Sequence, residues 1–262
     1  MASTKLPARR PLRHACSARM TGLLVACIVL GGTSPALAGE MYLSVGLGGG
    51  PDDAWNWQTL TWTPFSAASE TGLIVRGSLK AEAKTYVTDI PARNDARIWV
   101  SGIGLDGELG WQVAGDWGNA ALLAGVAWRD YALSPFDPNS KLGPNQLRAR
   151  ATAQGHLVGG DDWGGFWYAD YISGVNEWFA EAKPYYQLEN GLKVGPEFSL
   201  SGGDDYLHAR AGISLMGWEF NLPWVGRFWA GGSAGALWDT GGTRVEPYGA
   251  LHLTRAISFN GS

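Results

Sequence analysis

The chain has 262 residues, of which 20 are basic, 24 are acidic and 38 are glycine, and it carries 14 tryptophans. The acidic balance argues against nucleic acid as a partner. Both cysteines, Cys16 and Cys27, precede residue 39, so disulfides, zinc-thiolate sites and thiol catalysis are excluded from the rest of the chain.

Residues 1–38 predict a cleavable signal peptide of the Sec type. Basic residues from Lys5 to Arg19 come first, an apolar stretch of residues 23–30 follows, and Pro35-Ala36-Leu37-Ala38 is a small-x-small cleavage site. The apolar stretch is too short to cross a bilayer as a helix. We expect cleavage after Ala38, which leaves a mature domain of residues 39–262 with 15 basic and 24 acidic residues.

Three other interpretations of this segment remain open. The first is a short membrane anchor. The second is a lipoprotein, because Leu24, Val25 and Ala26 have the residue types that precede a lipidated cysteine, here Cys27. The third is a twin-arginine signal at residues 9–10, although this pair lies far from the apolar stretch.

The mature domain alternates between apolar and polar residues, with a period of two. Between residues 73 and 84, apolar residues alternate with charged ones, and the pattern recurs over residues 148–157, 207–215 and 248–259. Such alternation predicts β-strands. In a bilayer the apolar face contacts lipid and the polar face lines a lumen. Seven tryptophans lie near the expected strand ends, where aromatic girdles form at the two membrane–water interfaces. They are Trp99, Trp111, Trp128, Trp167, Trp178, Trp218 and Trp238.

Turn clusters divide the domain into about 12 strands, and 10 or 14 remain possible. The predicted ranges are 40–48, 54–65, 71–87, 96–114, 119–130, 146–158, 163–174, 177–188, 192–201, 205–219, 226–238 and 243–259. The predicted fold class is therefore all-β, an antiparallel transmembrane β-barrel in a Gram-negative outer membrane, with long connections such as 88–95 and 133–145 outside. A soluble β-sandwich or lipocalin-like barrel is the alternative.

The polar faces predict a lumen that is lined by charged residues of both signs and by histidines. The candidate lumen residues are Arg76, Lys80, Glu82, Arg148, Arg150, His156, Glu181, Glu197, His208, Arg210 and His252. Ion pairs between them would fill the interior. Inward aromatic rings could stack on sugar C–H faces, and the expected inward rings are Trp62, Tyr168, Tyr185, Trp229 and Tyr248.

Motifs of catalysis are weak in this chain. Residues 231–235 match the G-x-S-x-G pattern, but they lie inside a predicted strand with no helix after it, so no nucleophile elbow is expected. No histidine spacing indicates a metal site, and we expect no cofactor and no enzymatic activity. A histidine beside a serine and a carboxylate would still allow a lipid-modifying enzyme.

A more specific pattern spans residues 129–139, which read R-D-Y-A-L-S-P-F-D-P-N. This block resembles the D-Y-x-L-S-P-x-D-P-x-N segment of the cellulose biosynthesis protein BcsS family. Residues 193–198 resemble the V-G-P-E strand of that family, and residues 73–76 fit its apolar-Arg strand. The resemblance covers nearly all of the mature chain. It departs after Arg76, where residues 80–84 read K-A-E-A-K instead of glycines and aromatics.

The resemblance implies a non-enzymatic outer-membrane accessory of bacterial cellulose biosynthesis or secretion. Its partners would be outer-membrane lipid and either cellulose, another β-glucan or the cellulose synthase machinery. A narrow, charged lumen favours docking over a wide pore. The alternatives are a lipid-modifying enzyme, a small general porin or a surface antigen. The candidate functional loop comprises Asp130, Tyr131, Leu133, Ser134, Pro135, Asp137, Pro138 and Asn139, which could equally be a rigid turn.

Overall fold

The computed structural model describes residues 39–258 except 68, 92, 204–206 and 240–244, so the predicted signal peptide lies outside the described residues. The strands are β1 (Glu40–Gly49), β2 (Asp53–Thr63), β3 (Gly72–Ile90), β4 (Arg93–Gly115), β5 (Gly118–Ser134), β6 (Gln146–Val158), β7 (Trp163–Ile172), β8 (Glu177–Gln187), β9 (Lys193–Gly202), β10 (Leu207–Leu222), β11 (Gly226–Asp239) and β12 (Val245–Ser258). Among these residues, no helix is long and apolar enough to span a membrane.

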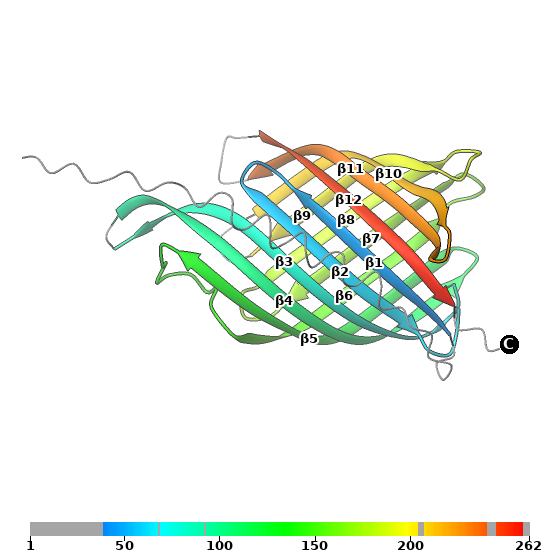
Figure 1. Cartoon of the computed structure of the whole chain (residues 1–262), viewed down its shortest axis with the longest axis horizontal. Helices are drawn as coiled ribbons and strands as arrows, with labels where there is room; N and C mark the ends of the chain where they lie inside the picture. The colour runs from blue at the N-terminus through cyan, green and yellow to red at the C-terminus, as the bar shows by residue number, and fades with distance from the viewer. Residues whose placement is uncertain (1–38, 68, 92, 204–206, 240–244, 259–262) are drawn as a thin grey trace, which may run out of the picture. The chain divides into compact units, whose positions relative to one another are not determined.

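The 12 strands form one closed antiparallel barrel (Figure 1). Each strand pairs with its neighbours in sequence, and β12 closes the barrel by pairing with β1, from Glu40 with Ser258 to Gly49 with Gly249. Closure leaves no free sheet edge between the two ends, as a strand fold in lipid requires. The prediction of a 12-stranded antiparallel barrel is confirmed.

The two ends of the barrel carry different connections. We call the end where β1 starts and β12 ends the short-turn end, and the opposite end the long-loop end. The longest connection, residues 135–145, lies at the long-loop end. The predicted 88–95 connection is wrong, because β3 runs to Ile90 and β4 begins at Arg93. The short-turn end also holds one longer connection, residues 64–71, so the difference between the ends is smaller than expected.

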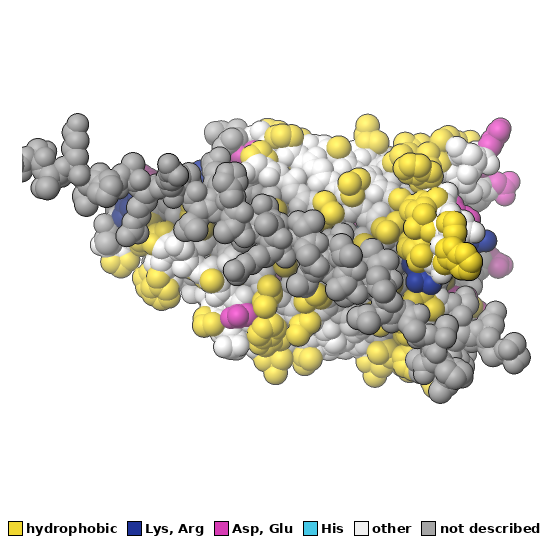
Figure 2. All heavy atoms as spheres, in the orientation of Figure 1, with side chains coloured by type: hydrophobic (Ala, Val, Ile, Leu, Met, Phe, Trp, Pro, Cys, Tyr) yellow, Lys and Arg dark blue, Asp and Glu magenta, His cyan; other side chains and the backbone are white. Residues whose placement is uncertain are grey.

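The outward face of the barrel is apolar. Large exposed side chains on it include Leu109, Val126, Leu147, Ile213 and Leu251. Figure 2 shows apolar side chains spread over the visible wall, with charged side chains mainly near its ends. A surface of this kind would promote association in water but suits contact with hydrocarbon. The fold is therefore that of a transmembrane β-barrel.

Exposed tryptophans mark both margins of this apolar face. Trp111 pairs with Leu73 near the start of β3, and Trp163 begins β7, so both lie at the short-turn end. Trp99 pairs with Ser134 at the end of β5, which is at the long-loop end. The indole ring is amphipathic and prefers the boundary between hydrocarbon and water. These positions fit two interfacial girdles.

Three neighbouring strands are much longer than a bilayer needs. β3, β4 and β5 have 19, 23 and 17 residues, whereas about 9–11 residues cross a membrane. Figure 1 shows them reaching past the other strands at one end, which is the long-loop end. Their inner face there carries a buried apolar cluster of Ala96, Ile98, Val100 and Tyr131. This projection places the 135–145 connection above the mouth of the barrel.

Candidate functional site: the barrel lumen

Antiparallel pairing places alternate residues of every strand inside the barrel, and on β3 to β7 these residues form a charged knot. The knot consists of Arg76, Asp106, Glu108, Arg129, Arg150 and Asp170. Asp106 lies at its centre, with a fully buried side chain. Arg129 Nη1 donates to Asp106 Oδ1 at 2.5 Å, and Arg150 donates to Oδ2 of the same carboxylate. Arg150 Nη2 also donates to Asp170 Oδ2 at 2.6 Å.

Glu108 extends the knot toward the short-turn end. Thr152 Oγ1 donates to Glu108 Oε1 at 2.5 Å, and Arg76 Nη1 lies 3.9 Å from Glu108 Oε2. Arg76 also donates to Gln154 on β6. Three arginines thus face three carboxylates, and Lys80 Nζ also lies 4.0 Å from Asp106 Oδ2, so every carboxylate of the knot has cationic partners. Charges that are removed from water need such partners, because an unpaired buried ion is costly.

A second cluster surrounds Glu197 on β9. Lys183 Nζ lies 3.0 Å from Glu197 Oε2 and 3.0 Å from Glu181 Oε2. Tyr248 OH donates to Glu197 Oε1 at 3.0 Å, and Ser233 Oγ donates to the same atom at 3.2 Å. Ser233 is the serine of the G-x-S-x-G match. It lies within β11 and donates to a carboxylate, so its surroundings differ from the strand-to-helix turn of a hydrolase.

Ion pairs also cross the lumen. Lys84 Nζ on β3 lies 3.9 Å from Glu177 Oε1 on β8, five strands away around the barrel. Lys80 Nζ on β3 lies 3.8 Å from Asp170 Oδ2 on β7, four strands away. Side chains from nearly opposite walls therefore meet inside the barrel. These ion pairs narrow the part of the lumen that lies between β3 and the strands β7 and β8.

The wall formed by β11, β12, β1 and β2 is different, because small residues and aromatic rings line it. Trp55 and Trp57 on β2 pair with Gly48 and Gly46 on β1, which places both rings inside. The prediction that Trp62 points inward is wrong, since it pairs with Val75 on the lipid-facing side of β3. Both faces of β2 mix polar and apolar residues, so its sequence does not reveal which face is inside.

Arg210 joins this wall to β10. Its Nη2 lies 3.4 Å from Asp53 Oδ2, and its guanidinium lies 4.2 Å from the centre of the Trp55 ring and 5.8 Å from that of Tyr248. Such stacking of a cation on aromatic faces is favourable. β10 and β2 are four strands apart, so Arg210 also bridges the lumen.

The register places all eleven candidate lumen residues on the inward face but does not gather them into one site. Among the histidines, the His156 ring stacks on Phe166 with centroids 4.5 Å apart, and the His252 ring lies against Gly231. His208 is on β10 near the long-loop end, opposite Ser201. The three histidines thus lie on three different strands, β6, β10 and β12. Within the described part of the chain, no group of three or more potential ligands is arranged to hold a metal ion.

Sequence reasoning missed several lumen residues: Trp55, Trp57, Asp106, Glu108, Arg129, Asp170 and Lys183. A signal for two of them was present, because Asp106 and Glu108 alternate with Leu105 and Leu109 inside a predicted strand. Extending the period-two pattern through residues 96–114 would have placed both carboxylates inside.

The candidate functional loop is divided between a strand and a connection. Asp130, Tyr131, Leu133 and Ser134 belong to β5, and Pro135 to Asn139 begin the 135–145 connection. Asp137 is buried. Its Oδ2 accepts from Tyr86 OH at 2.8 Å, and its Oδ1 accepts from the Asn139 backbone N–H at 2.9 Å. The connection is therefore fixed to the inner face of β3.

Leu142 anchors the far side of the same connection. It packs on the cluster of Ala96, Ile98, Val100 and Tyr131, and also on Ala127, Ile172 and Val175. Arg148 Nη2 donates to the Lys141 carbonyl at 3.2 Å. The connection therefore packs against the inner face of β3 to β7 at the long-loop end, where it is held by both apolar and polar contacts.

Replacing Asp137 by alanine should release this connection. Loss of two hydrogen bonds to a buried carboxylate should raise the rate of trypsin cleavage after Lys141 by about tenfold, because local opening controls access of the protease. The measurement is the time course of the fragment that ends at Lys141, followed by mass spectrometry. Asp161→Ala, in the exposed 159–162 turn, is the control and should leave the rate unchanged. Equal rates in wild type and Asp137→Ala would contradict an anchoring role.

Several solved structures are similar to this chain at low sequence identity. The chain is similar to the KdgM porin, with 9% identity, 81% of this chain and 97% of that chain covered, and a TM-score of 0.45. It is similar to the CymD monoaromatic hydrocarbon channel, with 8% identity, coverage of 91% and 93%, and a TM-score of 0.43. The transport unit of the autotransporter AIDA-I from Escherichia coli shows 12% identity, coverage of 82% and 88%, and a TM-score of 0.43.

The comparison with protein families gives a match over most of the chain, whereas no curated protein matches. The model of the family described as cellulose biosynthesis protein BcsS matches residues 28–257. This range includes the block at residues 129–139, the strand at residues 193–198 and the lumen residues described above. The predicted resemblance is confirmed: the chain belongs to the cellulose biosynthesis protein BcsS family.

Proposed function

We propose that this protein is a non-enzymatic outer-membrane accessory of bacterial cellulose biosynthesis or secretion. The observation that carries the proposal is a closed barrel with an apolar exterior in a member of the BcsS family. Strand barrels of this kind reside in outer membranes, to which a Sec-type signal peptide with cleavage after Ala38 would deliver the chain. The short-turn end would then face the periplasm and the long-loop end the outside.

The contacts of the lumen support a role without chemistry of its own. Ser233 and Tyr248 both donate to Glu197, and that carboxylate is in turn paired with Lys183. The carboxylates of the charged knot are likewise held by arginines. Groups fixed in this way stabilise and shape a barrel interior, whereas a nucleophile needs an adjacent base that is free to take its proton.

The bridges across the lumen favour docking or holding of a partner over a wide diffusion pore. A 12-stranded barrel encloses a limited interior, and the Lys84–Glu177 and Arg210–Asp53 pairs cross it. The 135–145 connection also packs inside the long-loop end, against β3 to β7. We therefore propose that the protein is a contact point at the outer membrane, either for the cellulose synthase machinery or for the cellulose that it makes.

Deletion of the gene in a cellulose-producing strain should lower cellulose output, and the wild-type gene should restore it. Output is measured as acid-resistant glucan per cell, with the amount of synthase checked by immunoblot. A gene carrying His156→Ala and His208→Ala together should also restore output if the barrel reaches the outer membrane in equal amount. Unchanged cellulose after deletion would overturn the accessory role. Failure of this double variant at equal barrel levels would instead favour a histidine-dependent enzyme.

A further inference from the structure

We infer that the lumen binds one extended chain of an unbranched β-1,4-linked glucan against an aromatic strip formed by Trp55, Trp57, Trp229 and His252. The choice of glucan rests on the proposed function, whereas the location of the site rests on the geometry of the wall. The strip lies on β11, β12, β1 and β2, opposite the charged knot on β3 to β7.

Two successive rows of paired residues build the middle of the strip. In the first row Gly231, His252, Gly46 and Trp57 are partners across β11, β12, β1 and β2. In the second row Ser233, Ala250, Gly48 and Trp55 are partners across the same strands. Successive rows are about 7 Å apart along a strand. Apart from the rings, both rows consist of glycine, alanine and serine, which leave space on the lumen side.

Glycines let the rings lie flat against the wall. A Cβ atom at Gly46 would lie 2.5 Å from the Trp57 ring, and one at Gly48 would lie 2.6 Å from the Trp55 ring. The His252 ring lies against Gly231 in the same way. Any larger residue at these glycines would push the ring away from the backbone. One face of each ring is therefore covered by the wall, and the other is directed to the lumen.

The lumen face of Trp57 is available for a ligand. Among the described residues, no other ring stacks on Trp57 and no cation lies over it, whereas the Arg210 guanidinium lies 4.2 Å from the centre of the Trp55 ring. Pyranose rings with equatorial substituents present flat C–H faces, and these faces stack on indole. A β-1,4-linked chain is extended and ribbon-like, so successive units can follow a straight strip. An α-linked chain curves away from such a strip.

Polar groups flank the strip where sugar hydroxyls would lie. On the neighbouring strand β3, Lys80 is the partner of Trp57, and Glu82 is the partner of Trp55. Their side chains are 37% and 35% exposed, so both remain accessible inside the barrel. Equatorial hydroxyls point outward in the plane of the sugar ring, where a Lys–Glu edge can donate and accept hydrogen bonds. Arg210 closes the strip near the long-loop end through Asp53 and Trp55.

Binding of cellohexaose to the full mature barrel, folded in detergent, tests the inference by isothermal titration calorimetry. Wild type should bind cellohexaose and bind maltohexaose at least about tenfold more weakly. Trp57→Ala should weaken cellohexaose binding by at least about fivefold, because it removes the stacking face. Gly46→Ala should cause a similar loss, although it keeps both tryptophans, because the new methyl group displaces the Trp57 ring.

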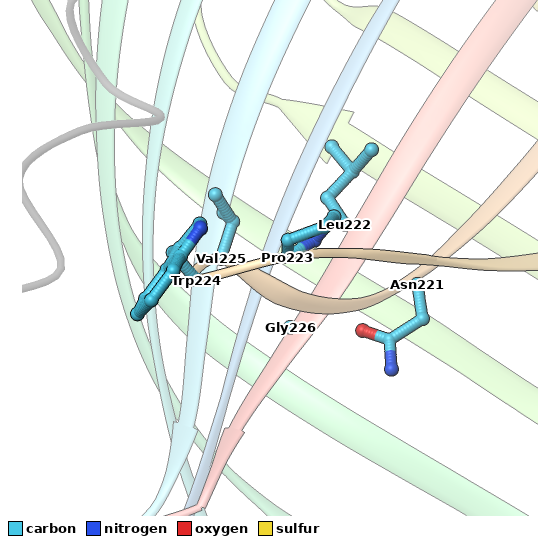
Figure 3. A pocket seen from close by; sticks show the side chains of 6 residues that line it. All are labelled: Asn221, Leu222, Pro223, Trp224, Val225 and Gly226. Carbon is cyan, nitrogen blue, oxygen red and sulfur yellow. The ribbon is translucent and has the colours of Figure 1, made fainter.

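Two variants serve as matched controls and should bind like wild type. Trp224→Ala removes a fully exposed tryptophan from the turn between β10 and β11, where Figure 3 shows it beside Pro223 and Val225. Gly107→Ala adds a methyl group where a Cβ would meet no atom within 4 Å. Folding of every variant is checked by its faster gel mobility before boiling.

The outcomes separate this inference from the proposed function. Absence of cellohexaose binding by folded wild type would overturn the glucan strip, as would equal binding of maltohexaose. Wild-type affinity in folded Trp57→Ala and Gly46→Ala would also overturn it. In each of these cases the accessory role would stand if the deletion strain still made less cellulose. Loss of binding in the two strip variants, with wild-type binding in the two controls, would support the strip.

Discussion

Replacing Ile213 by arginine should lower the stability of the membrane-inserted barrel by about 2–4 kcal/mol. Ile213 is 67% exposed on the outward face of β10, where it is the partner of Pro196 and Ala234. Trp218 lies on the same strand toward the short-turn end. Ala209, which is the partner of Trp238, lies on it toward the long-loop end, so Ile213 is between the two tryptophan levels. The position is therefore near the middle of the bilayer, where a guanidinium has no water. The measurement is equilibrium unfolding by denaturant in lipid vesicles.

Phe136→Arg is the matched control for this prediction. Phe136 is even more exposed, at 74%, but it lies in the 135–145 connection beyond the strands. Outside the hydrocarbon, an arginine at an exposed site should change stability by no more than about 0.5 kcal/mol. If Ile213→Arg were as harmless as Phe136→Arg, the exterior of the barrel would not be in contact with lipid.

The second large effect is expected at the centre of the charged knot. Asp106→Asn should destabilise the barrel by about 3–5 kcal/mol, because it removes the carboxylate that pairs with the buried Arg129 guanidinium and one of the carboxylates that pair with Arg150. Both carboxylate oxygens of Asp106 are engaged, one by Arg129 and the other by Arg150. Asparagine keeps the volume of the side chain, so the loss reports charge pairing and not a cavity. Unfolding in lipid vesicles again provides the free energy.

Glu219→Gln is the control for the knot. Glu219 pairs with Arg227 at 3.2 Å on the β10–β11 hairpin, and both side chains are more than half exposed. Breaking an exposed pair of this kind should cost no more than about 1 kcal/mol. A similarly small loss in Asp106→Asn would mean that water reaches the knot and that it does not fill the lumen as a dry structure.

The barrel could be predicted from the sequence because its main determinant is local. Alternation of apolar and polar residues with a period of two indicates strands directly. Backbone N–H and C=O groups in lipid must form hydrogen bonds within the protein, so the strands must close into a barrel. Boundaries were harder where turn residues lie inside strands. Asp89, Pro91 and Asp95 are of residue types that are common in turns, and they lie in the predicted 88–95 connection. In the structure, Asp95 adopts a positive φ of 51°, its backbone N–H donates to the Asp89 carboxylate, and an irregularity at Thr88–Ile90 lets the hairpin continue.

The arrangement inside the lumen could not be predicted in the same way. Lys84 meets Glu177 only because closure brings β3 and β8 to opposite walls, and no local pattern in the chain encodes that distance. The inward face of β2 depends on register as well, since Trp62 and Trp57 have the same chemistry and lie on opposite faces. A one-residue slip exchanges the two faces. The sequence thus predicts which charged and aromatic residues the lumen contains. Which charges form ion pairs, and which aromatic rings face the lumen, depends on the register of the strands.

The most direct test of this account is membrane fractionation combined with heat-modifiable gel mobility of the mature protein. The protein should appear in the outer-membrane fraction, should need detergent for extraction, and should migrate faster before boiling than after. A protein found in the soluble periplasmic fraction, folded without detergent and with the same mobility before and after boiling, would contradict a lipid-embedded barrel and the cellulose role that is built on it.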